Sequence, residues 1–443
     1  MPSARLQAVQ ELINVLANHV REGTVSSTSI LPQLQTLKVL GREPSNCGPI
    51  CAQIGISTLK SIGLPDGQPT PSSLEALRCL ANALLLHPPA RVTYVEEGGI
   101  ENTLKRYESA DIDEEFLLGR ILFLVTASSG PVIGEMMERA VVQTAIVNHL
   151  ERASETDVQE LQMAAMALAE TLKLLFNLAK NEPERVSTLQ STLPPLLRLL
   201  RNLRHSSGPP TAPLSHVIDA LFGLTPSEAV YQRPENVKRM IDILDLSLRL
   251  IDIKNLDSNT SATLDKGLTP LLGLLNNVAS GAPEDIREYI KSRLLPSTEE
   301  RKNPLGKGDG LNAKMIQLMG AGVGVENVKE CVGGLLYGLS DSNATKFIQN
   351  IGYGNAAGFL LNHGIATPAL SDLPQSSSES VNPITGQLVS EEEKIKLGDM
   401  TDEEKEREAE RLFVLFERLR KTGVVDVQNP IREAVESGRL SEM

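Results

Sequence analysis

Hydrophobic and polar positions follow a helical period along most of the chain. Four segments repeat one pattern, in which a Lys or Arg stands two residues before a Leu and apolar residues fill the surrounding positions. The segments cover residues 34–42, 74–82, 116–124 and 170–177. Because apolar side chains three and four residues apart share one face of a helix, the pattern predicts four amphipathic helices with corresponding buried faces.

The basic residues of the four segments are Lys38, Arg78, Arg120 and Lys173, and they are separated by 40, 42 and 53 residues. A period of about 40–47 residues with helical content is typical of armadillo and HEAT repeats. One helix pair cannot bury its apolar face alone, so neighbouring pairs stack into a continuous core. The sequence therefore predicts an all-α fold, an armadillo/HEAT-like helical repeat superhelix.

Corresponding helices of such an array line one concave groove. Side chains at i and i+4 on each helix point the same way, so the pattern predicts a ladder of polar, mostly basic groups along it. Such a groove suits an amphipathic helix or a peptide with a terminal carboxylate. The alternative is that the cations are merely solvated and that the Asn side chains brace the backbone. The ladder is predicted to contain Lys38, Arg42, Arg78, Asn82, Arg120, Lys173 and Asn177, with Phe123 and Phe176 beside it.

The last third of the chain changes in composition. We expect a repeat domain over residues 1–366, a flexible linker over 367–398, and a C-terminal amphipathic helix and tail over 399–443. A capping box over residues 401–404 begins the helix and a glycine at position 423 ends it. The helix either packs on the last repeat or clamps a partner. Its apolar stripe contains Leu412, Phe413, Phe416 and Leu419.

Charge and composition exclude several classes of protein. The formal net charge of -13 repels phosphate backbones, so nucleic acid is not an expected partner. No stretch reaches the roughly 20 apolar residues that span a bilayer, and the N-terminus lacks a signal pattern. The four cysteines form neither a disulfide framework nor a metal site, since Cys47 and Cys51 have no second pair or nearby His. We expect a cytoplasmic protein without cofactors.

Sequence motifs of catalysis are absent. The glycine-rich stretch at 306–310 has the wrong spacing for a phosphate-binding loop, and the one at 352–358 misses the dinucleotide fingerprint by one residue. The six histidines are scattered, and no motif of a metalloprotease or serine hydrolase occurs. We therefore predict no covalent catalysis.

Three blocks carry a resemblance to a known family. Residues 346–361, 381–387 and 400–410 resemble the synembryn family, the non-receptor guanine nucleotide exchange factors and chaperones of heterotrimeric G protein α subunits (Gα). Residues 77–82 and 172–178 resemble the inner repeat helices of that family.

The resemblance implies that GDP-bound or nucleotide-free Gα is the partner, with its C-terminal helix held in the groove. The family's groove contacts match Lys38, Arg42, Asn82, Phe123 and Asn177, with Arg78, Lys173 and Phe176 adjacent. The C-terminal helix of this chain would reach the GTPase core. The resemblance also implies a protein that is monomeric alone and is recruited to the plasma membrane or cell cortex by its partner. Family members carry activating phosphorylation in the linker, which is less acidic here and contains Ser376, Ser377, Ser378 and Ser380.

Two other functions remain open from the sequence. A generic armadillo-type scaffold or adaptor would bind peptides in the same groove, and an enzyme would use an unfamiliar site. A scaffold would leave the rate of nucleotide release from Gα unchanged, whereas an enzyme would keep its activity after replacement of the groove residues.

Overall fold

A computed structural model describes residues 4–25, 30–127, 131–224, 228–366, 381–382, 385–388, 390–391 and 407. The described residues contain no β-strand, and a single isolated antiparallel bridge joins Val381 to Leu388. The chain divides into two compact units, Met1–Leu388 and Val389–Met443, and the repeat helices belong to the first. Two sets of residues predicted from the sequence lie outside the described residues. They are the apolar stripe of the predicted C-terminal helix, Leu412, Phe413, Phe416 and Leu419, and the linker serines Ser376, Ser377, Ser378 and Ser380.

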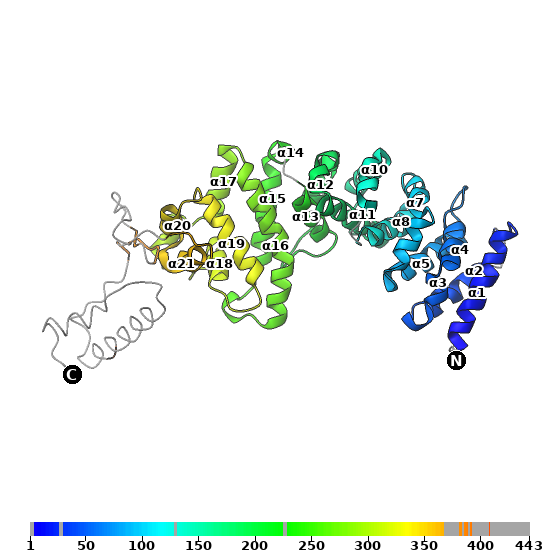
Figure 1. The fold of residues 1–443 in the computed structure, drawn as a ribbon. Helices are drawn as coiled ribbons and strands as arrows, with labels where there is room; N and C mark the ends of the chain where they lie inside the picture. Colours follow the sequence, from blue (N-terminus) through cyan, green and yellow to red (C-terminus); the bar gives the residue numbers. More distant parts are fainter. Residues whose placement is uncertain are drawn as a thin grey trace. The chain divides into compact units, whose positions relative to one another are not determined.

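Helices follow one another through the first unit, joined mostly by short turns (Figure 1). The α-helices are α1 (Ala4–Arg21), α2 (Ile30–Leu40), α3 (Gly48–Cys51), α4 (Gln53–Gly63), α5 (Pro71–Leu86), α6 (Ala90–Glu96), α7 (Gly99–Tyr107), α8 (Ile112–Thr126), α9 (Pro131–Glu138), α10 (Ala140–Ser154), α11 (Gln162–Asn181), α12 (Leu193–Asn202), α13 (Leu214–Gly223), α14 (Glu228–Tyr231), α15 (Pro234–Leu248), α16 (Ser258–Gly281), α17 (Glu284–Leu294), α18 (Leu311–Met319), α19 (Glu326–Leu339), α20 (Ala344–Ile351) and α21 (Tyr353–Asn362). The 3₁₀ helices are η1 (Pro44–Asn46), η2 (Pro183–Thr192), η3 (Ile253–Asn255) and η4 (Glu300–Lys302).

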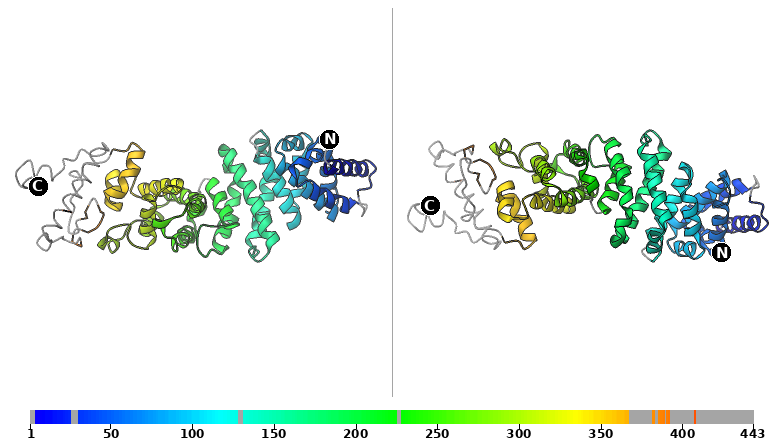
Figure 2. Two further views of the ribbon diagram at one scale, coloured as in Figure 1. Left: turned by 90° about the horizontal axis from the view of Figure 1, so that it is seen from below. Right: turned by 90° about the horizontal axis from the view of Figure 1, so that it is seen from above.

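The helices of the first unit form two packed rows (Figures 1 and 2). Row B is α2, α5, α8, α11, α13, α16 and α19, and each of these helices packs against the next. Row A is α1, α4, α7, α10, α12, α15 and α18, with α6 between α4 and α7. Each row-A helix also packs against the row-B helix that follows it in the chain. This stacking of helix pairs confirms the predicted armadillo/HEAT-like fold.

The hydrophobic stripes of the sequence become the core between the rows. In α11 the side chains of Leu172, Leu175 and Leu178 are fully buried, as are Leu77 and Leu80 of α5. Burial of one such leucine contributes about 1.5–3 kcal/mol relative to exposure, which explains why the helical period is a reliable signal here.

Capping residues fix the points at which α5 and α8 begin. The backbone N–H of Ser73 donates to the Thr70 hydroxyl at 3.1 Å, and the Thr70 N–H donates to the Ser73 hydroxyl at 2.7 Å. At α8 the N–H of Glu114 donates to the Asp111 carboxylate at 3.0 Å. Such caps satisfy N–H groups that have no partner inside the helix.

Candidate functional site

The four repeated cations lie on matching positions of four neighbouring helices. Lys38, Arg78, Arg120 and Lys173 belong to α2, α5, α8 and α11, which are consecutive members of row B. Their side chains are between 23 and 37 % exposed, so each charge reaches the surface from a half-buried position. We call these residues the row-B cation stripe.

A buried carboxylate joins the first two cations of the stripe. Glu75 of α5 is 4 % exposed and forms ion pairs with Lys38 of α2 and, at 3.0 Å, with Arg78 of its own helix. Burial acts to raise the pKa of Glu75, but hydrogen bonds from Lys38 and Arg78 outweigh it and the net shift is downward. The glutamate is therefore held ionised between two helices.

A second carboxylate joins the other two cations in the same way. Glu170 of α11 is 4 % exposed, and its Oε1 accepts from Arg120 Nη1 at 3.2 Å across to α8. Its Oε2 lies 2.7 Å from the Nζ of Lys173, three residues on in the same helix. Each glutamate thus pairs with one cation of its own helix and one of the preceding row-B helix.

These glutamates belong to the candidate site, and the sequence prediction missed them. Both occur in the pattern E-x-x-[KR], as Glu75 with Arg78 and Glu170 with Lys173, so a signal was present. Two cations and one carboxylate leave each cluster with a formal charge of +1. The net charge of the stripe is therefore smaller than that of the cations alone, but it remains positive.

Aromatic rings flank the second cluster. The Lys173 Nζ lies 4.7 Å from the ring centroid of Phe123, and the Lys180 Nζ lies 5.8 Å from that of Phe176. The Asn177 side chain donates to the Phe123 carbonyl at 3.3 Å and to the Thr126 hydroxyl at 3.2 Å. Phe123, Phe176 and Asn177 are all half-buried on the same helices as the stripe. Asn177 thus joins α11 to α8, the bracing role that the sequence left as an alternative.

Arg42 and Asn82 differ from the rest of the predicted ladder. Helix α2 ends at Leu40, so Arg42 lies in the following turn rather than one turn on from Lys38 within the helix. Arg42 is exposed and forms no ion pair within the described part of the chain. Asn82 is half-buried in α5, one turn after Arg78. Both side chains are available for an external ligand.

The aromatic positions continue beyond the predicted residues. Phe222 of α13 is 39 % exposed and follows Asp219 as Phe176 follows Lys173, three residues later. A Cβ built on Gly273 of α16 would lie 2.6 Å from the Phe222 ring, so the ring rests directly on the α16 backbone. The shared apolar pattern of α11 and α13 is the signal that could have identified Phe222.

The repeated cation is absent from the row-B helices after α11. The position of Lys173 is occupied by Asp219 in α13 and by glycines, Gly273 and Gly334, in α16 and α19. The candidate site therefore combines a basic section over α2–α11 with an aromatic section over α8–α13. A helical peptide that ends in a carboxylate and carries apolar side chains matches this combination.

A buried polar network links α8 and α11, which carry part of the site, to α7 and α10 of row A. Glu115 of α8 accepts from the Thr171 hydroxyl of α11 at 2.9 Å and pairs with Arg152 of α10. His149 of α10 donates through Nε2 to the Tyr107 carbonyl at 2.8 Å, while its Nδ1 accepts from Arg152 at 3.0 Å. This neutral tautomer satisfies both ring nitrogens, and burial lowers the pKa of His149.

The described residues outside the stripe offer neither a metal site nor a membrane span. They contain no cluster of His, Cys, Asp and Glu suited to a metal ion, and no helix among them is long and apolar enough to cross a bilayer. Burial raises the pKa of the Cys51 and Cys79 thiols to about 12, so both stay protonated at neutral pH.

Comparison with known proteins shows the family of this chain. The family model described as guanine nucleotide exchange factor synembryn matches residues 33–439. The chain belongs to the synembryn family. The Synembryn-like chaperone of Schizosaccharomyces pombe is 25 % identical over 414 residues, which cover 83 % of this chain and 76 % of that protein. Chaperone Ric-8A of Xenopus tropicalis is 25 % identical over 449 residues (88 % and 81 %), and that of Bos taurus is 26 % identical over 468 (94 % and 85 %).

Two solved structures that resemble this chain are a designed armadillo repeat protein and an engineered protein. A designed armadillo repeat protein is 14 % identical, with a TM-score of 0.42 over 64 % of this chain and 99 % of that one. An engineered protein is 16 % identical, with a TM-score of 0.46 over 81 % of this chain and 82 % of that one.

Proposed function

We propose that this member of the synembryn family is a guanine nucleotide exchange factor and folding chaperone for G protein α subunits. The C-terminal helix of Gα binds along row B, and its terminal carboxylate pairs with the cation stripe. The observation that carries the proposal is that the chain belongs to the synembryn family. Its row B also presents four half-buried cations and adjoining aromatic rings, which suit a helix that ends in a carboxylate. The family is described as an exchange factor and the two relatives are named chaperones, which agrees with both activities.

The residues along row B would make three kinds of contact with the Gα helix: ionic, apolar and hydrogen-bonded. Lys38, Arg78, Arg120 and Lys173 attract the carboxylate, and Arg42 adds an exposed charge at the α2 end. Phe123 and Phe176 cover apolar side chains of the Gα helix, and Asn82 offers its amide to the backbone of that helix. Asn177 offers only its side-chain oxygen, because its Nδ2 already donates to α8. Because Glu75 and Glu170 hold the cations in place before binding, little side-chain entropy is lost on association.

Exchange follows from linkage between two binding equilibria. A protein that binds nucleotide-free Gα more tightly than Gα·GDP lowers the affinity for GDP by the same factor. Withdrawal of the C-terminal helix of Gα from its own sheet would loosen the guanine pocket. The same grip would shield a partly folded subunit until GTP binding releases it. No bond is made or broken, so the protein needs no catalytic residue or cofactor.

The segment after the repeats is proposed to make a second contact. The predicted apolar stripe of Leu412, Phe413, Phe416 and Leu419 would bind the GTPase core. Truncation before Met400 should therefore reduce exchange more than binding of a Gα tail peptide. Equal losses would indicate that the C-terminal helix is only structural.

The deciding experiment times GDP release. Purified Gα loaded with fluorescent GDP is mixed with this protein, and release is followed with and without excess GTP. An exchange factor accelerates the release, whereas a peptide-binding scaffold leaves the rate unchanged. A matched sample in which a Gα tail peptide occupies row B should lose the acceleration.

A further inference from the structure

Arg301 links the last repeats to a distant segment of the chain. Its guanidinium donates through Nη1 to the Gly386 carbonyl at 3.1 Å and through Nη2 to the Asn350 carbonyl at 3.0 Å. In return, the N–H of Leu388 donates to the Arg301 carbonyl at 2.8 Å. The Gln387 side chain adds a bond to the Lys302 carbonyl at 2.9 Å. We call Arg301, Asn350 and residues 386–388 the clasp.

The charge of Arg301 is satisfied by backbone rather than by acid. Among the described residues no carboxylate lies within ion-pair distance of its guanidinium, and burial lowers its pKa. An arginine nevertheless remains protonated, so its charge must be solvated by the carbonyls that it contacts. Loss of residues 386–388 from the clasp would leave part of this demand unmet, which favours the closed arrangement.

The distant segment is shaped to fit against the repeats. The N–H of Gly386 donates to the Asn382 carbonyl at 2.8 Å, and the N–H of Asn382 donates to the Gln387 carbonyl at 2.7 Å. Gly386 has φ of +71°, and a Cβ there would collide with Leu305 and lie 3.3 Å from the Gly352 nitrogen. Gln387 and Leu388 are 7 % and 6 % exposed. Only glycine fits both this backbone conformation and this space.

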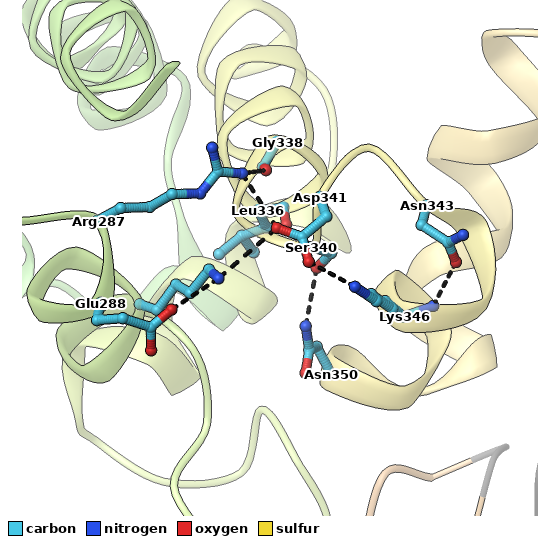
Figure 3. Close-up of polar contacts among 10 residues, drawn as sticks. Arg287, Glu288, Leu336, Gly338, Ser340, Asp341, Asn343, Lys346 and Asn350 are labelled. Atoms are coloured by element: carbon cyan, nitrogen blue, oxygen red, sulfur yellow. Dashed lines mark hydrogen bonds and ion pairs between the residues drawn. The ribbon is translucent and has the colours of Figure 1, made fainter. Parts of the chain in front are cut away.

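Asn350 is anchored to the preceding helices (Figure 3). Its side chain donates to the Ser340 hydroxyl at 2.9 Å, at the end of α19. Next to Ser340, Asp341 accepts from Arg287 of α17 at 3.2 Å and from Lys346 of α20 at 2.6 Å. The clasp is therefore attached to a turn that three helices hold in place.

We propose that the clasp is a positioning device for exchange, with Arg301 as its positioning residue. It fixes the point at which residues 389–443 leave the repeat unit, while the cation stripe on α2–α11 binds the Gα tail independently. The inference rests on the proposed function, in which the predicted C-terminal helix, which begins at the capping box of residues 401–404, makes the second contact with Gα.

The length of the tether gives the expected size of the effect. With the clasp closed, only residues 389–400 separate the repeat unit from the predicted helix. With the clasp open, residues 367–400 do. The local concentration of a tethered group falls with roughly the −3/2 power of tether length, so the second contact should weaken about fivefold.

Two variants open the clasp by unrelated means. Arg301→Met removes the donors, and Gly386→Ala adds a Cβ where none fits without changing any charge. Arg293→Gln is the matched control, since Arg293 lies in α17 and, among the described residues, forms an ion pair only with Asp242, at 3.9 Å. Each full-length protein is tested for GDP release from Gα, for affinity to a Gα tail peptide, and for hydrogen exchange of the Gly386 and Leu388 amides.

Both clasp variants should show faster amide exchange at 386 and 388 and about fivefold slower GDP release, with peptide affinity within about twofold of the parent. Arg293→Gln should match the parent in all three. Unchanged GDP release despite freed amides would overturn the proposal, as would a parallel loss of peptide affinity. If the parent itself fails to accelerate GDP release, the proposed function fails. Amide exchange that is unchanged in both variants would overturn the clasp itself.

Discussion

The Arg120 guanidinium of α8 donates to the Glu170 carboxylate of α11 across 3.2 Å. The same arrangement joins Lys38 of α2 to Glu75 of α5. Two row-B cations on different helices are therefore held by acids that lie in the next helix of the row. The polar surface proposed to bind Gα is also part of what holds the repeats together.

Replacement of Glu170 by Gln should destabilise the repeat unit. The change leaves Arg120 and Lys173 close together without the carboxylate between them. We expect a loss of about 1–3 kcal/mol in the free energy of unfolding, measured by urea denaturation. Glu160→Gln is the control, because Glu160 is 66 % exposed in its pair with Arg204 and should change stability by less than about 0.5 kcal/mol. Equal effects would mean that burial adds nothing to the Glu170 pairs.

Charge reversal at Arg42 should weaken binding of a Gα tail peptide without loss of stability. Arg42 is exposed and has no ion pair among the described residues, so Arg42→Glu alters the field at the α2 end of the stripe alone. We expect about fivefold weaker binding by calorimetry at low salt, and less at high salt. The double change with Lys38→Glu is less informative, since it would set two carboxylates together at Glu75.

Arg139→Glu provides the control for Arg42. Arg139 is exposed just before α10 of row A and has no ion pair in the described ranges. The control should bind the peptide like the parent. If the two variants weaken binding equally, the effect comes from net charge and not from the stripe.

Truncation of Phe222 to Ala should also reduce peptide binding. The ring is 39 % exposed and lies over Gly273, so it offers an apolar surface to a ligand and contributes little to the core. We expect about tenfold weaker binding in a fluorescence anisotropy titration. Leu250→Ala removes a side chain that is 78 % exposed outside the row-B helices and should have no effect. Unaltered affinity in Phe222→Ala would limit the site to α2–α11.

Stability should fall as the solution is acidified through the range in which His149 titrates. Burial holds the pKa of His149 below its unfolded value of about 6.5, so the unfolded chain takes up a proton that the folded chain refuses. The stabilisation is complete above about pH 6.5 and is lost as the pH falls toward the folded pKa, by up to about 1.4 kcal/mol per pH unit.

The measurement is urea unfolding from pH 7.5 to 5.5. His149→Gln removes the titrating group, and its stability should vary less with pH than that of the parent over this interval. His87→Gln is the matched control, because it makes the same substitution at an exposed histidine that directly follows α5. A His149→Gln variant with the slope of the parent would show that another group titrates.

The sequence was a good guide to the helices and a poor guide to their polar contacts. The repeated segments became α2, α5, α8 and α11 because their apolar faces have one period and one burial solution. Glu75 and Glu170 were not predicted as part of the site, since a glutamate three residues before a cation usually lies on a solvated helix face. Only the packing of neighbouring helices turned them inward.

The clasp is a second polar contact that the sequence did not predict, and it joins residues farther apart in the chain. The sequence predicted residues 367–398 as a linker, because few large apolar residues occur there. The structure places Gln387 and Leu388 against the backbone of η4, where Arg301 bonds to the Gly386 carbonyl. Backbone carbonyls carry no sequence signal, so this contact could not be read from composition.

By itself, the sequence determined the all-helical repeat fold, the matching register of the four cations, and the family through its distinctive blocks. Those properties depend on local periodicity, which every turn of helix repeats. The tertiary structure alone decided which acid each cation meets, where α2 ends before Arg42, and how residues 386–388 return to Arg301. Such contacts join side chains and carbonyls far apart in the chain, and only the packing of whole helices brings them within bonding distance.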